Sequence, residues 1–241
     1  YFENKACFYW IDLDLEHMEI VPVSVPCDDK KDFCIEYVLK AGKNCAASSP
    51  FAAKPLGSCT VYWQAFCAGG KKLLKADVQF NLDSDLPELA KIGLTCSVSA
   101  NISSVCWYGA GKEESYCDRD AGAALGLYQS APEDMEFAYI VPQESGNRTG
   151  IRFARLSGGN GFSFAAQKPV NFSVAKHTAS DLWKCRHTCE LTPTNRGENA
   201  RFVLNIDFAQ RGVGTATCGP DTLEQYKIRP GIYRNTLWFV W

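Results

Sequence analysis

Short runs in which apolar and polar residues alternate recur along most of this 241-residue chain, and this alternation constrains its fold more than any other feature. Successive side chains of a β-strand point to opposite faces of a sheet, so alternation indicates strands with one buried face. The predicted strands are Phe33–Lys40, Thr60–Ala68, Leu73–Leu82, Ile92–Ala100, Met135–Val141, Gly150–Leu156, Val170–Ala175, Phe202–Ala209 and Leu237–Trp241. The chain is therefore predicted to be all-β, with two packed antiparallel sheets.

Turns and short helical segments separate the predicted strands. Ala68–Lys71 and Ser157–Asn160 each contain a Gly-Gly pair, which is typical of tight turns. Short helical or irregular segments are predicted at Asp85–Lys91 and Ser180–Arg186, with the Ser180 side chain capping the second. Since the sequence has no repeat and no long linker, residues 1–241 are predicted to form a single domain.

Twelve cysteines are a second strong signal in a chain of this size. An even, high count favours an oxidising compartment, so we expect a secreted protein in which disulfides pair these residues. Cys45 and Cys59 are expected to hold the Ala- and Ser-rich loop Lys43–Leu56. The closest pair, in the segment Cys185–Cys189, lacks the clustered spacing of a zinc site, so no metal is predicted.

Charge and hydropathy exclude several partners. The formal net charge is −2, which argues against nucleic acid as a ligand. No apolar run approaches the roughly 20 residues that a membrane-spanning helix needs, so no membrane span is predicted. No phosphate loop, HExxH or other cofactor motif occurs, so no cofactor is predicted. The chain starts at Tyr1 without Met, and we expect either a mature terminus after cleavage or a fragment.

Three sequons agree with secretion, at Asn101, Asn147 and Asn171. Asn101 is the better candidate for glycosylation, because the other two fall inside segments that carry the family resemblance described next.

Four blocks of the sequence carry this resemblance. They are Ala90–Arg119, Ala138–Thr149, Pro169–Leu191 and Leu204–Leu223, and the last contains the run FAQRGVGTATCGPDTL. Their order and spacing resemble the C-terminal (small-chain) domain of large bacterial-type β-galactosidases of glycoside hydrolase family 2. The resemblance implies an antiparallel β-supersandwich related in shape to galactose mutarotases, here with disulfides added. Residues 60–241 are family-like, and residues 1–59 diverge.

The resemblance also implies that the catalytic residues lie elsewhere. The family hydrolyses galactosides with two Glu residues on a barrel that alone needs about 250 residues, so no catalytic residue is expected in this chain. The carboxylates of Glu114, Asp118 and Glu144 are instead expected to form ion pairs with Arg119 and Arg148.

In the family, the loop that matches residues 212–221 reaches over the active site. The resemblance therefore implies a carbohydrate-facing loop, whose candidate residues are Gly214, Thr215, Thr217, Cys218 and Asp221. Some family members carry an aromatic ring at about the position of Cys218, where a cysteine offers no face for stacking on sugar. The alternative role of Cys218 is that of a disulfide end.

Aromatic and histidine side chains are candidates for two further kinds of site, a sugar-stacking site and a mutarotase-type site. Aromatic rings stack on sugars but equally fill sandwich cores, and the rings concerned are those of Trp63, Trp107, Tyr108 and Trp183. A mutarotase-type reaction needs a histidine acid and a carboxylate base, although lone histidines are usually structural. The available histidines are His17, His177 and His187.

Two functions remain. The first is a non-catalytic, secreted glycoprotein module with a carbohydrate-binding or structural role in an extracellular assembly, whose partners are carbohydrates, glycoproteins or other extracellular chains. The alternative is the C-terminal chain or fragment of a split or processed β-galactosidase whose barrel lies on another chain. The cysteines that replace family residues favour the first, since added disulfides suit a repurposed extracellular domain.

Overall fold

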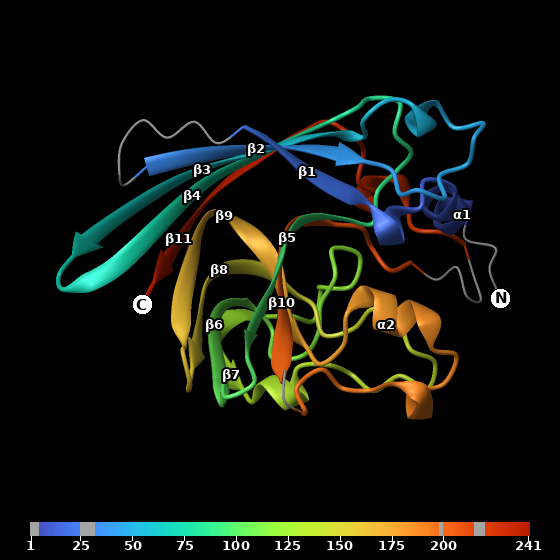
Figure 1. The fold of residues 1–241 in the computed structure, drawn as a ribbon. Coiled ribbons are helices and arrows are strands. Elements are labelled where there is room, and N and C mark those ends of the chain that lie inside the picture. The colour runs from blue at the N-terminus through green and yellow to red at the C-terminus, as the bar shows by residue number, and fades with distance from the viewer. Residues whose placement is uncertain (1–4, 25–31, 198–199, 215–219) are drawn as a thin grey trace. The chain divides into compact units, whose positions relative to one another are not determined.

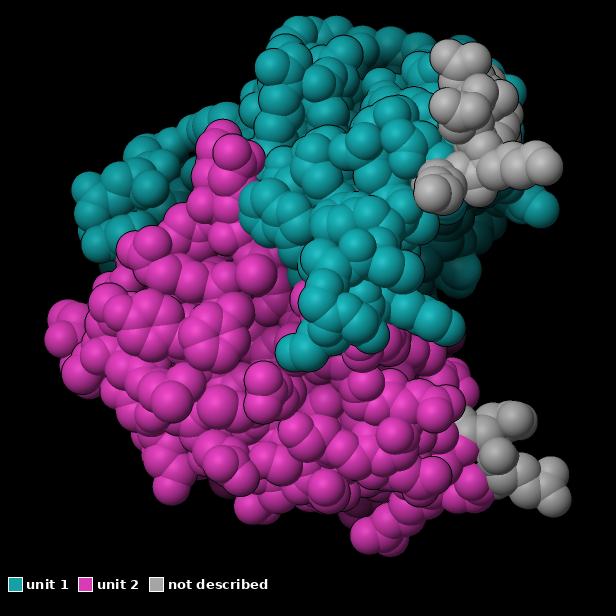
Figure 2. Space-filling view, turned by 90° about the vertical axis from the view of Figure 1, so that its left-hand side faces the viewer, with its two compact units in different colours: residues 1–91, 211–238 teal, residues 92–210, 239–241 magenta. Residues whose placement is uncertain are grey.

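The computed structural model describes residues 5–24, 32–197, 200–214 and 220–241, and it confirms an all-β protein whose reported strand pairs are antiparallel (Figure 1). The chain divides into two compact units, coloured separately in Figure 2. Unit 1 comprises residues 1–91 and 211–238, and unit 2 comprises residues 92–210 and 239–241. The single domain predicted for residues 1–241, with a divergent part before residue 60, stays a prediction. The finer prediction of a mutarotase-like supersandwich stays a prediction.

Unit 1 contains one antiparallel sheet with strand order β1-β2-β3-β4-β11. Its strands are β1 (Glu19–Ser24), β2 (Asp32–Lys40), β3 (Gly57–Ala68), β4 (Lys71–Leu82) and β11 (Ile232–Val240), of which the last two residues of β11 belong to unit 2. The helical segments are α1 (Lys5–Asp12), η1 (Leu15–His17), η2 (Pro50–Ala52) and η5 (Glu224–Tyr226). Burial alternates along β4, where Ala76, Val78 and Phe80 are buried, as the apolar pattern predicts.

The hairpin of β3 and β4 shows how the sequence sets the register. Ala68 pairs with Lys71, and the two glycines between them have φ angles of 57° and 75°. A two-residue turn with positive φ at both positions matches the right-handed twist of the strands, and glycine adopts it without strain. Every pair from Ala68–Lys71 to Gly57–Leu82 follows in register.

Unit 2 has the strand order β5-β10-β9-β8-β6-β7. Its strands are β5 (Lys91–Ser99), β6 (Ser104–Ala110), β7 (Leu125–Ser130), β8 (Arg148–Ser157), β9 (Phe162–Ala175) and β10 (Arg201–Gln210), and its helical segments are η3 (Pro132–Asp134), α2 (Ala179–Lys184) and η4 (Thr188–Glu190). Fully buried aromatic rings fill its core. The ring of Phe172 lies 5.8 Å from that of Trp107 and 6.2 Å from that of Phe164, centroid to centroid.

Most predicted strands exist, but Met135–Val141 is not one of them. It follows η3 as irregular chain, and its Ile140 side chain is 89% exposed. The carbonyl of Met135 accepts a hydrogen bond from the Arg148 guanidinium at 2.5 Å, so a side chain takes the place of a strand partner. The sequence pattern did not predict β1, β6, β7 or the first half of β9.

The helical predictions are correct in part. The segment Asp85–Lys91, predicted to be helical or irregular, is irregular, and β5 begins at its last residue. The second predicted segment contains α2, but its cap is Thr178, not Ser180. The Thr178 hydroxyl accepts from the backbone N–H of Asp181 at 3.1 Å, and the Asp181 carboxylate accepts from the N–H of Thr178 at 2.8 Å. This reciprocal pair is a capping box.

The prediction of disulfide stapling is wrong for the described cysteines. Cys34, Cys45, Cys59, Cys67, Cys96, Cys106, Cys117, Cys185 and Cys189 form no disulfide. The sheet register supplies a physical reason at several positions, because Cys34 lies opposite Tyr62, and Cys59 lies opposite Tyr37 and Phe80. A disulfide needs two Cα atoms within about 7 Å, which direct cross-strand neighbours provide.

Candidate functional site

A buried arginine connects the two ends of the loop predicted to face carbohydrate. Arg211 follows β10 and is only 6% exposed. Its Nη2 donates to both carboxylate oxygens of Asp221, at 2.8 and 2.9 Å, and its Nη1 donates to the Thr222 hydroxyl at 2.8 Å. One side chain therefore holds together the two ends of the segment 212–221.

We call residues 211–214 and 221–222, which flank this loop, the loop stem. Backbone groups add further contacts to it. The Thr222 hydroxyl donates to the carbonyl of Gly212 at 2.9 Å, and the N–H of Gly212 donates to the carbonyl of Tyr226 at 3.0 Å. Gly214 has a φ of 64°, and a Cβ added there would lie 2.7 Å from the Thr222 hydroxyl oxygen. Both the left-handed backbone and the close approach require glycine.

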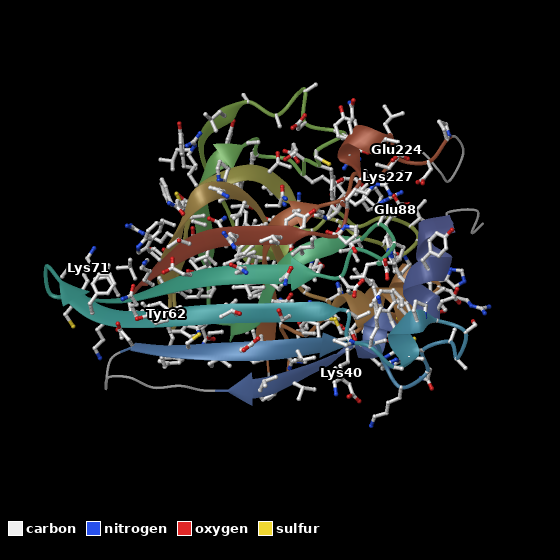
Figure 3. The ribbon with its side chains drawn as sticks, turned by 90° about the horizontal axis from the view of Figure 1, so that it is seen from above. Lys40, Tyr62, Lys71, Glu88, Glu224 and Lys227 are labelled. Atoms are coloured by element: carbon white, nitrogen blue, oxygen red, sulfur yellow. The ribbon has the colours of Figure 1, made fainter. Side chains whose placement is uncertain are left out.

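A charge network surrounds the stem, and Figure 3 shows Glu88, Lys227 and Glu224 side by side within unit 1. The Lys227 ammonium lies 3.5 Å from the Glu88 carboxylate, 3.6 Å from that of Asp221 and 2.7 Å from that of Glu224. Glu88 also lies 3.5 Å from Arg211 Nη2. The two cations thus contact the same two carboxylates, Glu88 and Asp221.

The network shifts the pKa values of Asp221 and Lys227. Burial acts to raise the pKa of Asp221, but hydrogen bonds from Arg211 and from the N–H of Thr222, and the positive charges nearby, outweigh it and hold that pKa below its usual value. The hydrogen bond to Glu224 raises the pKa of Lys227. Asp221 is therefore a carboxylate at neutral pH.

Of the predicted loop residues, Gly214 and Asp221 lie in the stem, whereas Thr215, Thr217 and Cys218 lie outside the described residues. Sequence reasoning missed Arg211, Thr222, Glu88 and Lys227. Arg211 and Thr222 lie inside the run FAQRGVGTATCGPDTL that carries the family resemblance, and this position was the sequence signal that could have identified them. No local pattern connects Glu88 to Arg211, 123 positions away.

The expected ion pairs of unit 2 are partly correct. Glu114 pairs with Arg119, and it also accepts from the Tyr139 hydroxyl and from the N–H of Gly146. Burial acts to raise the pKa of Glu114, but these bonds keep it below its usual value. The predicted carboxylate partner of Arg148 is wrong, because its guanidinium donates to backbone carbonyl groups instead.

Arg148 is 4% exposed and donates to the carbonyl groups of Lys112, Met135 and Gly146. Burial lowers its pKa, and its guanidinium lies 5.5 Å from the Trp107 ring centroid. The residue therefore fixes three chain segments around one side chain.

The three sequons differ in exposure. Asn101 is exposed in the turn after β5, and Asn171 is half-buried within β9, opposite Asp207. Asn147 is 1% exposed, and its side-chain amide donates to the carbonyl of Ser115 at 2.8 Å. A glycan on that nitrogen is incompatible with this burial, so Asn147 is no longer a candidate.

The aromatic candidates are mostly structural. Trp107 is fully buried, Trp63 stacks on Phe33, and Tyr108 stacks on Phe153, each stacked pair with ring centroids 6.1 Å apart. Trp183, on α2, is 53% exposed. Only this last ring lies open to solvent.

The three histidines each contact a carboxylate. His17 lies 2.7 Å from Asp14, and the Glu190 carboxylate accepts from the backbone N–H of His187 at 3.4 Å. Nδ1 of His177 lies 3.3 Å from the Glu136 carboxylate. Both His17 with Asp14 and His177 with Glu136 are thus side-chain pairs of a histidine and a carboxylate, as the mutarotase-type hypothesis requires. Of these two histidines, His17 is exposed and His177 is largely buried.

The described residues include no group of three His, Cys, Asp or Glu residues arranged to hold a metal ion. Among the helices of the described segments, none is long and apolar enough to cross a membrane.

Residues 11–239 match the family described as "Beta galactosidase small chain". Among curated proteins, a β-galactosidase of Halalkalibacterium halodurans is 34% identical over 133 residues, which are 54% of this chain and 12% of that protein. A β-galactosidase of Priestia megaterium is 27% identical over 214 residues, 88% of this chain and 19% of that protein. The chain thus spans less than a fifth of these two relatives.

A solved structure described as a putative aldose 1-epimerase from Escherichia coli K12 is similar over 92% of this chain and 68% of its own, with 11% identity and a TM-score of 0.41. A score of this size establishes neither a shared fold nor a shared activity.

Proposed function

The chain belongs to the β-galactosidase small-chain family, and on this basis we propose that it serves as the non-catalytic small-chain part of a β-galactosidase-type glycoside hydrolase. In this proposal the catalytic barrel is supplied outside these 241 residues, and the segment 212–221 forms part of the rim of the sugar site. The loop stem carries the proposal, since it fixes both ends of that segment.

The chemistry of the stem suits positioning rather than catalysis. A glycosidase needs a carboxylic acid that stays protonated near neutral pH to protonate the leaving group. The lowered pKa of Asp221 is the opposite of that requirement. Asp221 contacts both Arg211 and Lys227, which stabilise its charged form. Glu88 contacts the same two cations.

A rigid stem has a clear use in such an enzyme. Holding substrate in a reactive geometry contributes strongly to rate, and loops achieve this only when their ends are fixed. Arg211 is buried and bonds to two residues at the far end of the segment, so the stem is already ordered before a sugar binds.

A hybrid enzyme tests the proposal. The small-chain segment of the H. halodurans β-galactosidase is replaced by this chain, and kcat and KM for a nitrophenyl galactoside are compared with those of the same enzyme lacking the segment. We expect this chain alone to be inactive and the hybrid to hydrolyse faster than the truncated enzyme. A hybrid no faster than the truncated enzyme contradicts the proposal.

Loop variants add a second readout. Asp221→Asn is expected to raise KM of the hybrid, because it loosens the stem, whereas Glu224→Gln removes the same charge at an exposed site and leaves KM unchanged. Equal effects of the two variants contradict the assigned role of the loop.

The second candidate is a separate secreted glycoprotein module. The exposed sequon at Asn101 favours it. The main argument for this candidate was the expectation of added disulfides. Because the nine described cysteines form none, we prefer the enzyme-associated role. Loss of mass on treatment of the native protein with a glycosidase that removes Asn-linked glycans, with no barrel chain bound, supports this second candidate.

A further inference from the structure

A pocket in unit 2 has no role in the proposed function. It holds a volume of about 140 Å³ and is lined by residues of the irregular segment 136–145, by the two residues that follow β9, by Leu182 of α2, and by Thr188 and Leu191 at the two ends of η4. The side chains that matter to its chemistry are those of Glu136, Phe137, Tyr139, His177, Leu182 and Leu191. All of them belong to residues 92–210, so the pocket shares no residue with the loop stem.

Two buried atoms in this pocket have no hydrogen-bond partner within the described structure. They are Nε2 of His177 and Oε2 of Glu136, whose side chains are 11% and 9% exposed. The nearest cation to Oε2, the Lys176 ammonium, lies 3.8 Å away, beyond hydrogen-bond distance. Buried polar atoms of native proteins nearly always have partners, so an occupant that supplies them is expected.

The geometry indicates what the occupant donates. His177 Nδ1 lies 3.3 Å from Glu136 Oε1, so this nitrogen carries the proton that bonds the carboxylate. In a neutral imidazole the other nitrogen, Nε2, is then an acceptor. Oε2 of a carboxylate is also an acceptor. The pocket therefore presents two acceptors and is complemented by two hydroxyl groups.

Charge in the pocket is balanced. The Glu136 carboxylate faces the Lys176 ammonium at 3.8 Å, and that ammonium also donates to the carbonyl of Glu133 at 3.0 Å. The ammonium and the carboxylate offset each other, so this pair carries no net charge. A neutral ligand is favoured.

One part of the remaining wall is apolar and is formed by Leu182, Leu191 and the rings of Phe137 and Tyr139. The polar residues Gln143, Ser145 and Thr188 also line the pocket. A cavity of about 150 Å³ accommodates a six-membered ring such as benzene. The pocket is of that size, and Phe137 at its edge is 59% exposed, so substituents of a ring can extend into solvent. A pyranose ring combines an apolar C–H face with hydroxyl donors on its edge.

We propose that this pocket binds a neutral monosaccharide in its pyranose form, with one hydroxyl donating to Nε2 of His177, a second donating to Oε2 of Glu136, and the C–H face against the apolar wall. The proposal concerns binding alone. It does not depend on the hydrolase role, since it stands on residues of unit 2 and its test measures no hydrolysis.

The test uses the three histidines as separate probes in NMR spectra of the whole protein. Galactose, glucose and mannose are titrated while the imidazole resonances are followed. We expect at least one sugar to shift the His177 resonances saturably and to leave those of His17 in place. His177→Phe is expected to weaken binding at least tenfold, measured by saturation transfer to the sugar, whereas His187→Phe, the same substitution outside the pocket lining, leaves binding unchanged.

Glu136→Gln provides a second variant in case His177→Phe does not fold, because it keeps the shape of the side chain and also weakens binding. Three results overturn the proposal. They are no saturable shift at His177 with any of the sugars, as expected if water alone fills the pocket; equal loss of binding in the two histidine variants; and a shift produced by acetate or galacturonate but by none of the neutral sugars.

Discussion

Replacing Asp221 by Asn tests the loop stem most sharply. The substitution preserves the shape of the side chain and one of its two oxygens but removes the charge. In the native protein the carboxylate accepts from Arg211 Nη2 at 2.8 and 2.9 Å and from the N–H of Thr222 at 2.7 Å. The variant therefore leaves the buried guanidinium with Glu88, 3.5 Å away, as its remaining carboxylate contact in the described network.

The magnitude follows from these contacts. A hydrogen bond to a charged group contributes about 1.5–3 kcal/mol, and removal of one partner of a fully buried ion pair costs about 3–5 kcal/mol. The Asp221 side chain is 35% exposed and Glu88 compensates in part, so the lower end applies. We predict a loss of about 2 kcal/mol in the free energy of unfolding of the Asp221→Asn variant.

Urea unfolding at neutral pH measures this loss, and hydrogen exchange of the Gly212 and Thr222 amides localises it to the stem. Glu224→Gln is the matched control, because it removes the same charge from a side chain that is 69% exposed, and no measurable loss is expected there. Equal unfolding midpoints for Asp221→Asn and Glu224→Gln, with unchanged exchange at both amides, would refute the reasoning.

Further predictions concern residues outside this pair. Gly214→Ala is predicted to destabilise the protein by about 1–2 kcal/mol in urea unfolding, because its φ of 64° disfavours a side chain; an unchanged midpoint contradicts this. Arg148→Lys is predicted to lower the unfolding midpoint, since an ammonium cannot donate to three separated carbonyl groups with the geometry of the guanidinium. The folded pKa of Glu114 is lowered, so its stabilising effect is present above the ordinary value of 4.5 and is lost as the pH falls through the folded pKa; Glu114→Gln is expected to show a weaker loss of stability over that acid range. In the native protein Cys67, which is exposed, is expected to react with iodoacetamide before Cys59, whose pKa burial raises to about 11; equal labelling rates, or no labelling of either until reduction, contradict the thiol assignment.

Strands with a clear alternation were predictable from the sequence, and those that deviate from it were not. The run that became β4 alternates, and its buried positions are those the pattern indicates. β1 contains Pro22 and β7 contains Gly126, both of which weaken a strand pattern. Met135–Val141 carries a strand-like pattern, yet Arg148, thirteen positions from Met135, binds the carbonyl group that a ladder would need.

The site was predictable as a segment but not as a set of contacts. The resembling run located residues 212–221, and Asp221 was selected for its place in that run. Its role as the partner of buried Arg211 depends on the chain folding back after ten residues, and Glu88 comes from a distant part of the sequence. The cysteine count misled because it carries no information on register, which places Cys34 and Cys59 opposite aromatic residues.

The most direct test of the central claim is to isolate the native species that contains this chain and to identify its polypeptides by intact-mass and peptide mass spectrometry. We expect a barrel sequence in the same species, either bound to this chain or continuous with it, together with hydrolysis of a galactoside. A lone chain of 26.7 kDa, with or without glycans, that carries no barrel and hydrolyses no galactoside would contradict the proposed function.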